Sequence, residues 1–205
     1  RTPSSAASDV YKRQGNKLAK KLITLFDLPI AAPSANLSER TSVTNIMDID
    51  PILQKKIFVL KDKQSSHGLE STVVRIDTNN EIEVLRYGSI TVEELNKYAK
   101  VKIKKKSSIS PGNLKKHYST LKPIRMNAKR ILKNEGLLNF GNNKLKSKII
   151  NLNLSNKKNL NEAAKNFYHY LHKLDQSRCK KIAVVEIPDK GLGKTINDRL
   201  RRAIK

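Results

Sequence analysis

The chain has 205 residues and a formal net charge of +24, from 42 Lys and Arg against 18 Asp and Glu. Apolar residues make up 38%, enough for a packed core, and the length suits one large domain or two small ones. No apolar stretch reaches the ~20 residues of a membrane span, because the best candidate, residues 22–32, is interrupted by Asp27 and Pro29. The single cysteine, Cys179, excludes an internal disulfide and a Cys-based zinc site. These features indicate a soluble protein of a reducing compartment, the cytoplasm.

The basic residues are mostly lysines spread along the chain, with the densest run at residues 100–106. Such a charge attracts polyanions such as nucleic acids. The accompanying Asn and Ile are equally what AT-rich codons produce, so the sequence leaves open whether the charge is functional or compositional. Aromatic residues are 5% and Trp is absent, so stacking platforms for single-stranded nucleic acid are scarce.

The first half of the chain predicts mixed helix and strand. Residues 1–14 have no hydrophobic period and are interpreted as a foreign or unstructured lead-in. Apolar positions then recur at helical spacing, at Leu18, Leu22, Ile23 and Phe26. Strand-like runs follow at residues 29–32, 57–60, 71–76 and 81–86. Thr91 is a suitable N-cap for a helix to about residue 100, with Glu93 and Glu94 at the positive end of its dipole.

The second half predicts a small parallel α/β domain. Residues 101–122 lose periodicity and gather Lys, Ser, Pro and Gly, which predicts a linker. Strand-like runs at residues 148–154 and 182–187 then alternate with helices. Asn159 is expected to cap the first helix, with Glu162 at the capping-box position, and residues 191–205 predict a closing helix. This βαβα order is typical of a parallel sheet.

Two motifs have a plain interpretation that is favoured over the functional one. Residues 191–195, GLGKT, follow a strand and open a helix, but a phosphate-binding P-loop needs glycine where Pro188 stands. Proline lacks an N–H donor, so a glycine-assisted turn is favoured. His169 and His172 lie one helical turn apart without a third metal ligand in register, so a solvated helix face is favoured over a metal site.

Ser34 and Asn36 follow a short apolar strand, at the edge where α/β sheets place their ligands. A hydroxyl and an amide there can bind a carboxylate, a phosphate or a ribose. On this chemistry alone a simple Ser/Asn turn remains the favoured alternative.

Several segments, taken in order, are more specific than any one of them. They are PIAAPSAN at residues 29–36, residues 42–44, GLESTVV at 68–74, LRYGSITVEEL at 85–95 and SPGNLKKHYSTLKP at 110–123. Together they resemble the L-threonylcarbamoyladenylate synthases, in the long two-domain form of the YrdC-like superfamily. GLGKTINDRLRRA at residues 191–203 is similar to that family's carboxyl-terminal signature, which removes the P-loop interpretation.

The resemblance implies an α/β fold in two parts. Residues 15–100 would be the rear of a YrdC-like catalytic domain with a twisted mixed sheet. Residues 101–122 would be a linker that also acts as a lid, and residues 123–205 a small Rossmann-like accessory domain with a parallel sheet.

The implied activity is nucleotidyl transfer: L-threonine, bicarbonate and ATP give threonylcarbamoyl-AMP and pyrophosphate, for tRNA threonylcarbamoyladenosine modification. Partner proteins would transfer the threonylcarbamoyl group to tRNA, and the chain itself would be in contact with tRNA. Magnesium is expected with ATP, without a protein ligand that can be named. The alternatives are a non-catalytic YrdC-like module that binds tRNA and a carbamoyl-transfer relative.

The family's pattern assigns binding roles and no covalent nucleophile, so no catalytic residue is named. Threonine-binding positions match Ser34 and Ser71. ATP-binding positions match Asn36, Thr44, Arg86 and Tyr118. An arginine suits that role because a guanidinium grips phosphate oxygens in bidentate fashion.

The chain departs from the family's pattern at Glu39, which replaces Gly, and at Val43 and Tyr87, which replace Pro. Ser119 and Thr120 replace Ala and Pro after the HY pair. These changes leave the contacting side chains in place. The family's Lys-x-Arg motif should precede residue 15 and does not, so the chain is expected to hold about half of the active site. A sheet that lacks its first strands would expose an unpaired edge and apolar surface, so the chain is expected to be poorly stable or prone to aggregation.

Overall fold

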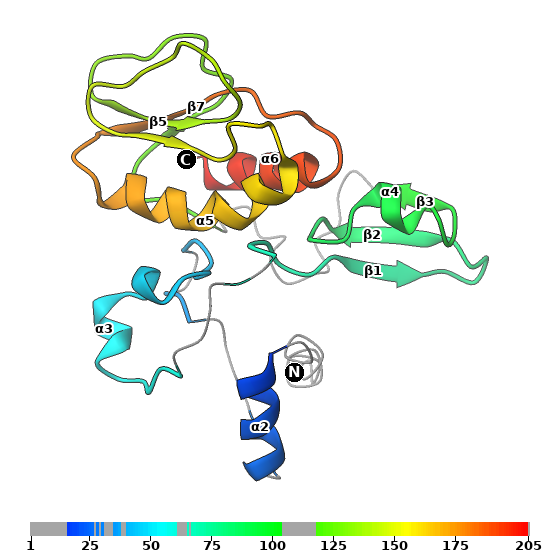
Figure 1. Ribbon diagram of the computed structural model, residues 1–205. Helices are drawn as coiled ribbons and strands as arrows, with labels where there is room; N and C mark the ends of the chain where they lie inside the picture. The colour runs from blue at the N-terminus through cyan, green and yellow to red at the C-terminus, as the bar shows by residue number, and fades with distance from the viewer. Residues whose placement is uncertain are drawn as a thin grey trace.

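The structure is a computed structural model that describes residues 16–26, 28, 30, 35–37, 40–60, 65, 67–103 and 118–204. We call the described residues up to 103 the first unit and residues 118–204 the second unit (Figure 1). A sheet in the order β1-β2-β3 belongs to the first unit, and a sheet in the order β4-β7-β5-β6 to the second. The expected lead-in lies outside the described residues, as do almost all of the strand at residues 29–32 and most of the linker.

The first unit begins with helix α2 (Lys17–Phe26), whose first turn is capped by Asn16, because its Oδ1 accepts the Ala19 N–H at 2.8 Å. A short 3-10 turn, η1 (Ile46–Asp48), and helix α3 (Pro51–Gln54) follow. Asn45 and Asp50 cap them, since side chains of this kind satisfy the N–H groups that a helix start leaves open. Residues 57–60 form no strand, so that prediction is wrong.

The sheet of the first unit is mixed. β1 (Val73–Ile76) pairs antiparallel with β2 (Ile82–Arg86), which pairs parallel with β3 (Val101–Ile103). β3 lies in the segment expected to be linker, so the first unit continues to residue 103. The expected helix after Thr91 is only α4 (Val92–Leu95), with the complete capping box that Thr91 and Glu94 form.

The second unit is the predicted parallel α/β domain. Its strands are β4 (Ile124–Arg125), β5 (Glu135–Asn139), β6 (Asn151–Asn153) and β7 (Lys181–Val184), and every pairing among them is parallel. Its helices are α5 (Leu160–Gln176) and α6 (Leu192–Ala203). β4 and β5 were not expected from the sequence. β6, α5 and α6 lie where they were predicted, and β7 begins one residue before its predicted range of 182–187 and ends at Val184.

The main hydrophobic core lies in the second unit. Side chains with no exposed surface come from its sheet and from both of its helices, and they include Leu137, Leu138, Leu154, Phe167, Leu174, Ile182, Ile196 and Leu200. α5 also faces the first unit (Figure 1), so this helix covers the core on one side and the site on the other.

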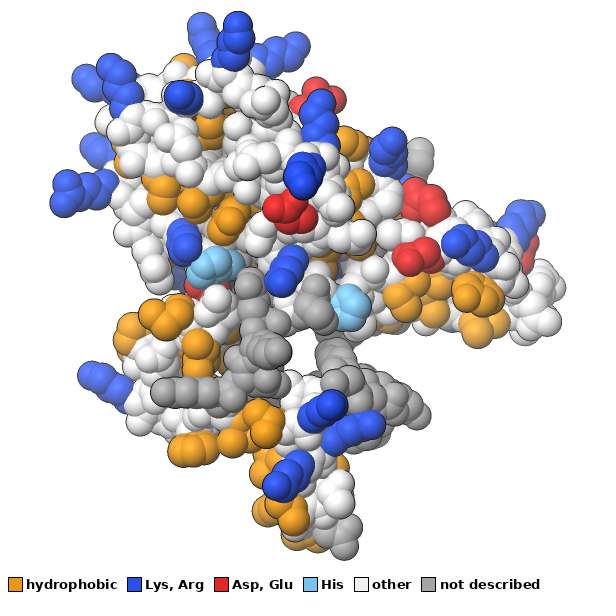
Figure 2. Space-filling model, viewed as in Figure 1, with side chains coloured by type: hydrophobic (Ala, Val, Ile, Leu, Met, Phe, Trp, Pro, Cys, Tyr) orange, Lys and Arg blue, Asp and Glu red, His pale blue; other side chains and the backbone are white. Residues whose placement is uncertain are grey.

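Large apolar side chains stay exposed on the first unit. Leu25 in α2, Met47 in η1 and Phe58 after α3 are exposed by 74%, 76% and 91%. Figure 2 shows apolar side chains exposed on the lower part of the molecule, with several Lys and Arg side chains beside them. No helix in the described ranges is both long and apolar enough to cross a membrane.

Candidate active site

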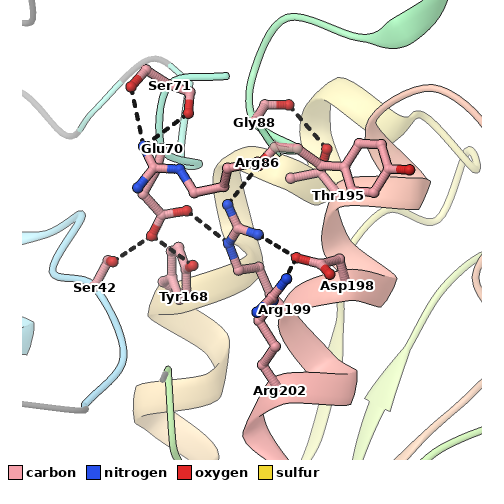
Figure 3. Close-up of polar contacts among 11 residues, drawn as sticks. Ser42, Glu70, Ser71, Arg86, Gly88, Tyr168, Thr195, Asp198, Arg199 and Arg202 are labelled. Atoms are coloured by element: carbon pink, nitrogen blue, oxygen red, sulfur yellow. Dashed lines mark hydrogen bonds and ion pairs between the residues drawn. The ribbon is translucent and has the colours of Figure 1, made fainter. Parts of the chain in front are cut away.

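Ser71 and Arg86 lie side by side at one end of the first sheet. Ser71 stands two residues before β1, and Arg86 is the last residue of β2, paired with Val73. The Arg86 Nη2 donates to the Ser71 carbonyl oxygen at 3.0 Å and to the Ser71 hydroxyl oxygen at 3.3 Å (Figure 3). The structure therefore brings together one expected threonine-binding residue and one expected ATP-binding residue.

The segments that carry these two residues are in backbone contact. A Cβ atom on Gly88 would lie 2.2 Å from the Thr72 nitrogen and 2.5 Å from the Ser71 oxygen. The Ser89 N–H donates to the Glu70 carbonyl oxygen at 2.8 Å. Only glycine permits this close approach, so Gly88 lets the segment that carries Arg86 lie against the segment that carries Ser71.

The Glu70 carboxylate is the centre of a polar network between the two units (Figure 3). It accepts hydrogen bonds from the Ser42 hydroxyl, from the Tyr168 hydroxyl at 2.7 Å and from the Arg199 Nε at 3.0 Å. Burial acts to raise the pKa of Glu70, but the Arg199 charge and the two hydroxyl donors outweigh it and lower that pKa below its ordinary value. Glu70 is therefore held as a carboxylate next to Ser71.

Tyr118 lies against this network. Its side chain is 2% exposed, and its ring centroid is 4.6 Å from the Arg199 guanidinium carbon and 6.0 Å from the Tyr168 ring centroid. Burial raises its pKa, the Glu70 charge adds to this, and the Arg199 and Arg86 charges oppose it. Tyr118 therefore belongs to the same cluster as Ser71 and Arg86, which we call the Ser71–Arg86–Tyr118 cluster.

Asn36 lies in the wall of a separate pocket. The pocket has a volume of about 150 Å³ and lies between residues 36–51 and the end of α5. The Asn36 amide donates to the Leu37 and Arg40 carbonyl oxygens at 3.0 and 3.2 Å, as in a turn. Its Oδ1 is buried and accepts no hydrogen bond within the described part of the chain. An acceptor left open in this way is available to a ligand.

For two other expected site residues, Thr44 and Ser34, the structure gives less information. The Thr44 hydroxyl is buried and has no hydrogen-bond partner among the described residues, while the Thr44 carbonyl oxygen accepts the Ser65 N–H at 3.3 Å. Ser34 lies outside the described residues. Ser71, Arg86 and Tyr118 do not line the Asn36 pocket, so the structure groups three of the six expected residues.

Sequence reasoning missed Glu70, Tyr168 and Arg199 as parts of the site. Glu70 lies inside GLEST and Arg199 inside GLGKTINDRL, so both stand in segments that carry the resemblance. Their place in these segments was the signal by which both residues could have been predicted as parts of the site. Nothing local to Tyr168 distinguishes it from the other aromatic residues of its helix.

The two histidines of α5 contact the first unit, so the expectation of a solvated helix face is wrong. His169 Nδ1 lies 2.9 and 3.0 Å from the two Asp48 carboxylate oxygens. His172 Nε2 lies 3.1 Å from the Thr41 hydroxyl oxygen and 3.2 Å from the Ser42 carbonyl oxygen. Within the ranges that the structure describes, His, Cys, Asp and Glu side chains nowhere gather in a group of three or more suited to a metal ion.

The GLGKT segment leads through a turn at Gly191 into the first residues of α6, which agrees with the predicted glycine-assisted turn. Gly191 has φ of +51°, and a Cβ on Gly193 would lie 2.0 Å from the Pro188 carbonyl oxygen. That carbonyl group fills the space inside the turn.

Known protein families match the chain in two adjoining segments. Residues 90–204 match the family described as "Threonylcarbamoyl-AMP synthase, C-terminal domain", and residues 15–88 match the family described as "Telomere recombination". Two curated proteins named "Threonylcarbamoyl-AMP synthase" are similar in sequence. The chain is 26% identical to that of Pyrococcus abyssi, over 92% of this chain and 61% of the relative, and 36% identical to that of Schizosaccharomyces pombe, over 50% and 28%.

Two solved structures share the fold. The P. abyssi Sua5 crystal structure "complexed with L-threonine" has a TM-score of 0.76 and 24% identity, over 92% of this chain and 61% of that chain. A His/Tyr double-alanine variant of the same protein has a TM-score of 0.69 and 22% identity, over 92% and 60%. The chain thus spans about three fifths of the P. abyssi protein, and these matches do not favour the RNA-binding alternative. Since the C-terminal domain model covers more than half of the chain, the chain belongs to the threonylcarbamoyl-AMP synthase family.

Proposed function

We propose that the chain carries part of the site at which L-threonine, bicarbonate and ATP form threonylcarbamoyl-AMP and pyrophosphate, for tRNA modification. The observation that carries the proposal is the contact between Arg86 and Ser71, since the family pattern gives these residues to ATP and to threonine. Two substrates that react with each other need binding groups at this separation. The relatives' name and the threonine complex of the P. abyssi protein support the proposal.

The reaction needs orientation and charge neutralisation rather than a covalent nucleophile. The threonine amine attacks the carbon of bicarbonate and water leaves, which gives a carbamate. A carbamate oxygen then attacks the α-phosphorus of ATP, and the bond to pyrophosphate breaks. Ser71 would donate to threonine, and the Arg86 guanidinium would neutralise phosphate oxygens as charge develops on them. Tyr118 would close the site against water.

The remaining roles belong to the same proposal. Ser34 would bind threonine, and Asn36 and Thr44 would use their open acceptor and hydroxyl groups on ATP. Magnesium would arrive with the ATP phosphates, and we assign it no protein ligand. We place the reaction in the cytoplasm, with tRNA and threonylcarbamoyl-transfer proteins as partners that consume the product.

The test measures ligand binding and turnover in the same preparations. Calorimetry gives the dissociation constants of ATP and L-threonine, and pyrophosphate release is followed with and without threonine and bicarbonate. Arg86→Met should weaken ATP binding at least tenfold, because a phosphate loses its guanidinium partner. Ser71→Ala should weaken threonine binding more than ATP binding.

The matched control is Arg178→Met, which removes the same charge from an exposed loop of the second unit. It should bind ATP like the parent chain. Equal ATP affinities for the Arg86 and Arg178 variants would contradict the assigned role of Arg86, and a parent chain that binds neither ligand would contradict the proposed function.

A further inference from the structure

Arg199 is a buried cation of α6 that reaches out of the second unit. Its side chain has no exposed surface. Its Nε donates to the Glu70 carboxylate at 3.0 Å, and its Nη2 donates to the Tyr87 carbonyl oxygen at 2.6 Å. Its Nη1 donates to Asp198 at 2.6 Å, and Asp198 also accepts from the Arg202 Nε at 2.9 Å (Figure 3). One guanidinium thus joins two separate segments of the first unit to one helix.

The two segments that Arg199 joins are those that carry the proposed substrate contacts. Glu70 directly precedes Ser71, and Tyr87 directly follows Arg86. Ser71 and Arg86 are in contact with each other. Arg199 therefore binds the chain neighbour of each residue in that contact. The planar fork of a guanidinium can do this because its donors point in fixed directions.

A second tie lies one helical turn earlier. The Thr195 hydroxyl donates to the Gly88 carbonyl oxygen at 2.9 Å, and both atoms are buried. Residues four apart lie on the same helix face, so Thr195 and Arg199 approach the segment of residues 86–88 together. At the start of the same helix, the Gly191 N–H donates to the Glu93 carboxylate at 3.1 Å.

The energetics make this connection hard to replace. A buried cation that loses its partners strongly destabilises the folded state, so the Arg199 charge constrains the positions of the Glu70 carboxylate and the Tyr87 carbonyl group. A surface ion pair would be worth far less and would not hold a loop in place.

We propose that Arg199, with Thr195 as its second tie, is a positioning residue that sets the distance between Ser71 and Arg86, and that this is a role of the accessory domain in the reaction. The substrate part of this inference rests on the proposed function. The residue itself would touch neither substrate, because its side chain has no exposed surface and each of its three guanidinium nitrogens already donates to Glu70, Asp198 or the Tyr87 carbonyl oxygen.

The test compares Arg199→Met with Arg199→Lys and with Arg201→Met in the full chain. Arg201 lies on the same helix, is 54% exposed at its side chain, and is 3.7 Å from Asp189, so its variant removes the same charge without touching the network. Amide hydrogen exchange is measured over residues 68–76 and 82–90, and the dissociation constants of ATP and L-threonine are measured by calorimetry. Thermal unfolding of each variant sets a temperature at which all are folded.

Arg199→Met should speed exchange at least tenfold in both segments and weaken both ligands at least tenfold. Arg199→Lys should restore part of the lost affinity, since an ammonium can pair with Glu70 but cannot form the two-directional fork. Arg201→Met should behave like the parent chain. Unchanged exchange in a folded Arg199→Met protein overturns the proposal, and so does faster exchange with unchanged affinities.

Two further outcomes are distinguishable. If the parent chain binds neither ligand, the proposed function fails, and the exchange of the two segments alone decides whether Arg199 positions them. If Arg199→Met does not fold, Thr195→Val decides: it keeps the shape of the side chain and removes one tie, so it should speed exchange in residues 82–90 more than in residues 68–76. Equal exchange to the parent in both segments would overturn the proposal there as well.

Discussion

His169 Nδ1 faces both carboxylate oxygens of Asp48, at 2.9 and 3.0 Å, and so binds the middle of α5 to the η1 turn of the first unit. The Asp48 side chain is 4% exposed and that of His169 is 15% exposed. Water has little access to the pair. We therefore expect removal of either side chain to weaken the attachment of the two units more than the loss of a solvent-exposed ion pair would.

A double-mutant cycle measures this attachment. For Asp48→Ala and His169→Ala we expect a coupling free energy of about 1–3 kcal/mol, because the two side chains interact directly. Urea unfolding of the two single variants and the double variant gives this value. The control cycle pairs His169→Ala with Lys133→Ala, an exposed lysine before β5, and should be additive. Additivity in both cycles would show that the Asp48 contact contributes nothing to stability.

Glu70→Gln should destabilise the chain strongly. The variant leaves the buried Arg199 guanidinium with Asp198 as its remaining carboxylate partner, and we expect a loss of about 3 kcal/mol in the free energy of unfolding. Chemical denaturation at neutral pH provides the measurement. Glu186→Gln, at an exposed position after β7, is the control and should change stability by less than about 0.5 kcal/mol. A loss no larger than the control's would mean that the pair is not needed for folding.

The pairing of Glu70 with Arg199 predicts that the free energy of unfolding falls at acidic pH. The pKa of Glu70 is lowered from its ordinary value of 4.5, so the folded state binds this proton less readily than the unfolded state. The stabilisation is therefore complete above about pH 4.5 and is lost as the pH falls through the lower folded value. The difference in unfolding free energy between the parent chain and Glu70→Gln should be constant from pH 7 to 5 and shrink toward pH 3. A difference that stays constant or grows below pH 4 would contradict the lowered pKa.

Local pattern was sufficient for the elements whose partners are nearby in sequence. The apolar spacing and the Asn159 cap predicted α5, and Thr91 with Glu94 predicted the start of α4. β5 was missed because it begins and ends with polar residues, Glu135 and Asn139, and its apolar run is therefore short; the buried Glu135 carboxylate accepts hydrogen bonds from Arg125 and from the Leu132 N–H. Residues 57–60 were wrongly predicted as a strand because the apolar residues there indicated burial, whereas Phe58 is exposed.

The candidate site was predictable only in part, because some of its contacts join residues that are far apart in the sequence. Ser71 and Arg86 were named because short motifs carry them, and their mutual contact spans only 15 residues of chain. The pairing of Glu70 with Arg199 spans 129 residues and joins two units. No local property of either residue indicates that Arg199 is buried and Glu70 partly buried, since that depends on the packing of the whole fold.

Gly88→Ala should push the segment of Arg86 away from the segment of Ser71 by a steric clash. Its new Cβ would lie within 2.5 Å of backbone atoms of Ser71 and Thr72, and backbone yields less easily than a flexible side chain. We expect a loss of about 1–3 kcal/mol in stability, together with weaker ATP binding as Arg86 moves away from Ser71. Denaturant unfolding and calorimetry check the two effects. The neighbouring Ser89→Ala keeps the Ser89 N–H bond to Glu70 and should match the parent chain; a Gly88 variant that also matches it would show that the close approach is not required.

The exposed apolar side chains of the first unit predict that the chain binds hydrophobic dyes and aggregates. Leu25 and Phe58 are the clearest cases, because 74% and 91% of their surfaces are open to water, and exposed apolar surface promotes association. The double variant Leu25→Gln/Phe58→Gln should lower dye fluorescence and raise the concentration at which light scattering begins. Its unfolding free energy should stay within about 0.5 kcal/mol of the parent, since neither side chain has a packed environment to lose. Leu132→Gln, at a 44% exposed position on the second unit, is the control and should leave the dye signal unchanged. If the control lowered the signal as much as the double variant, the dye would be reporting the second unit, and the first unit would not be the source of aggregation.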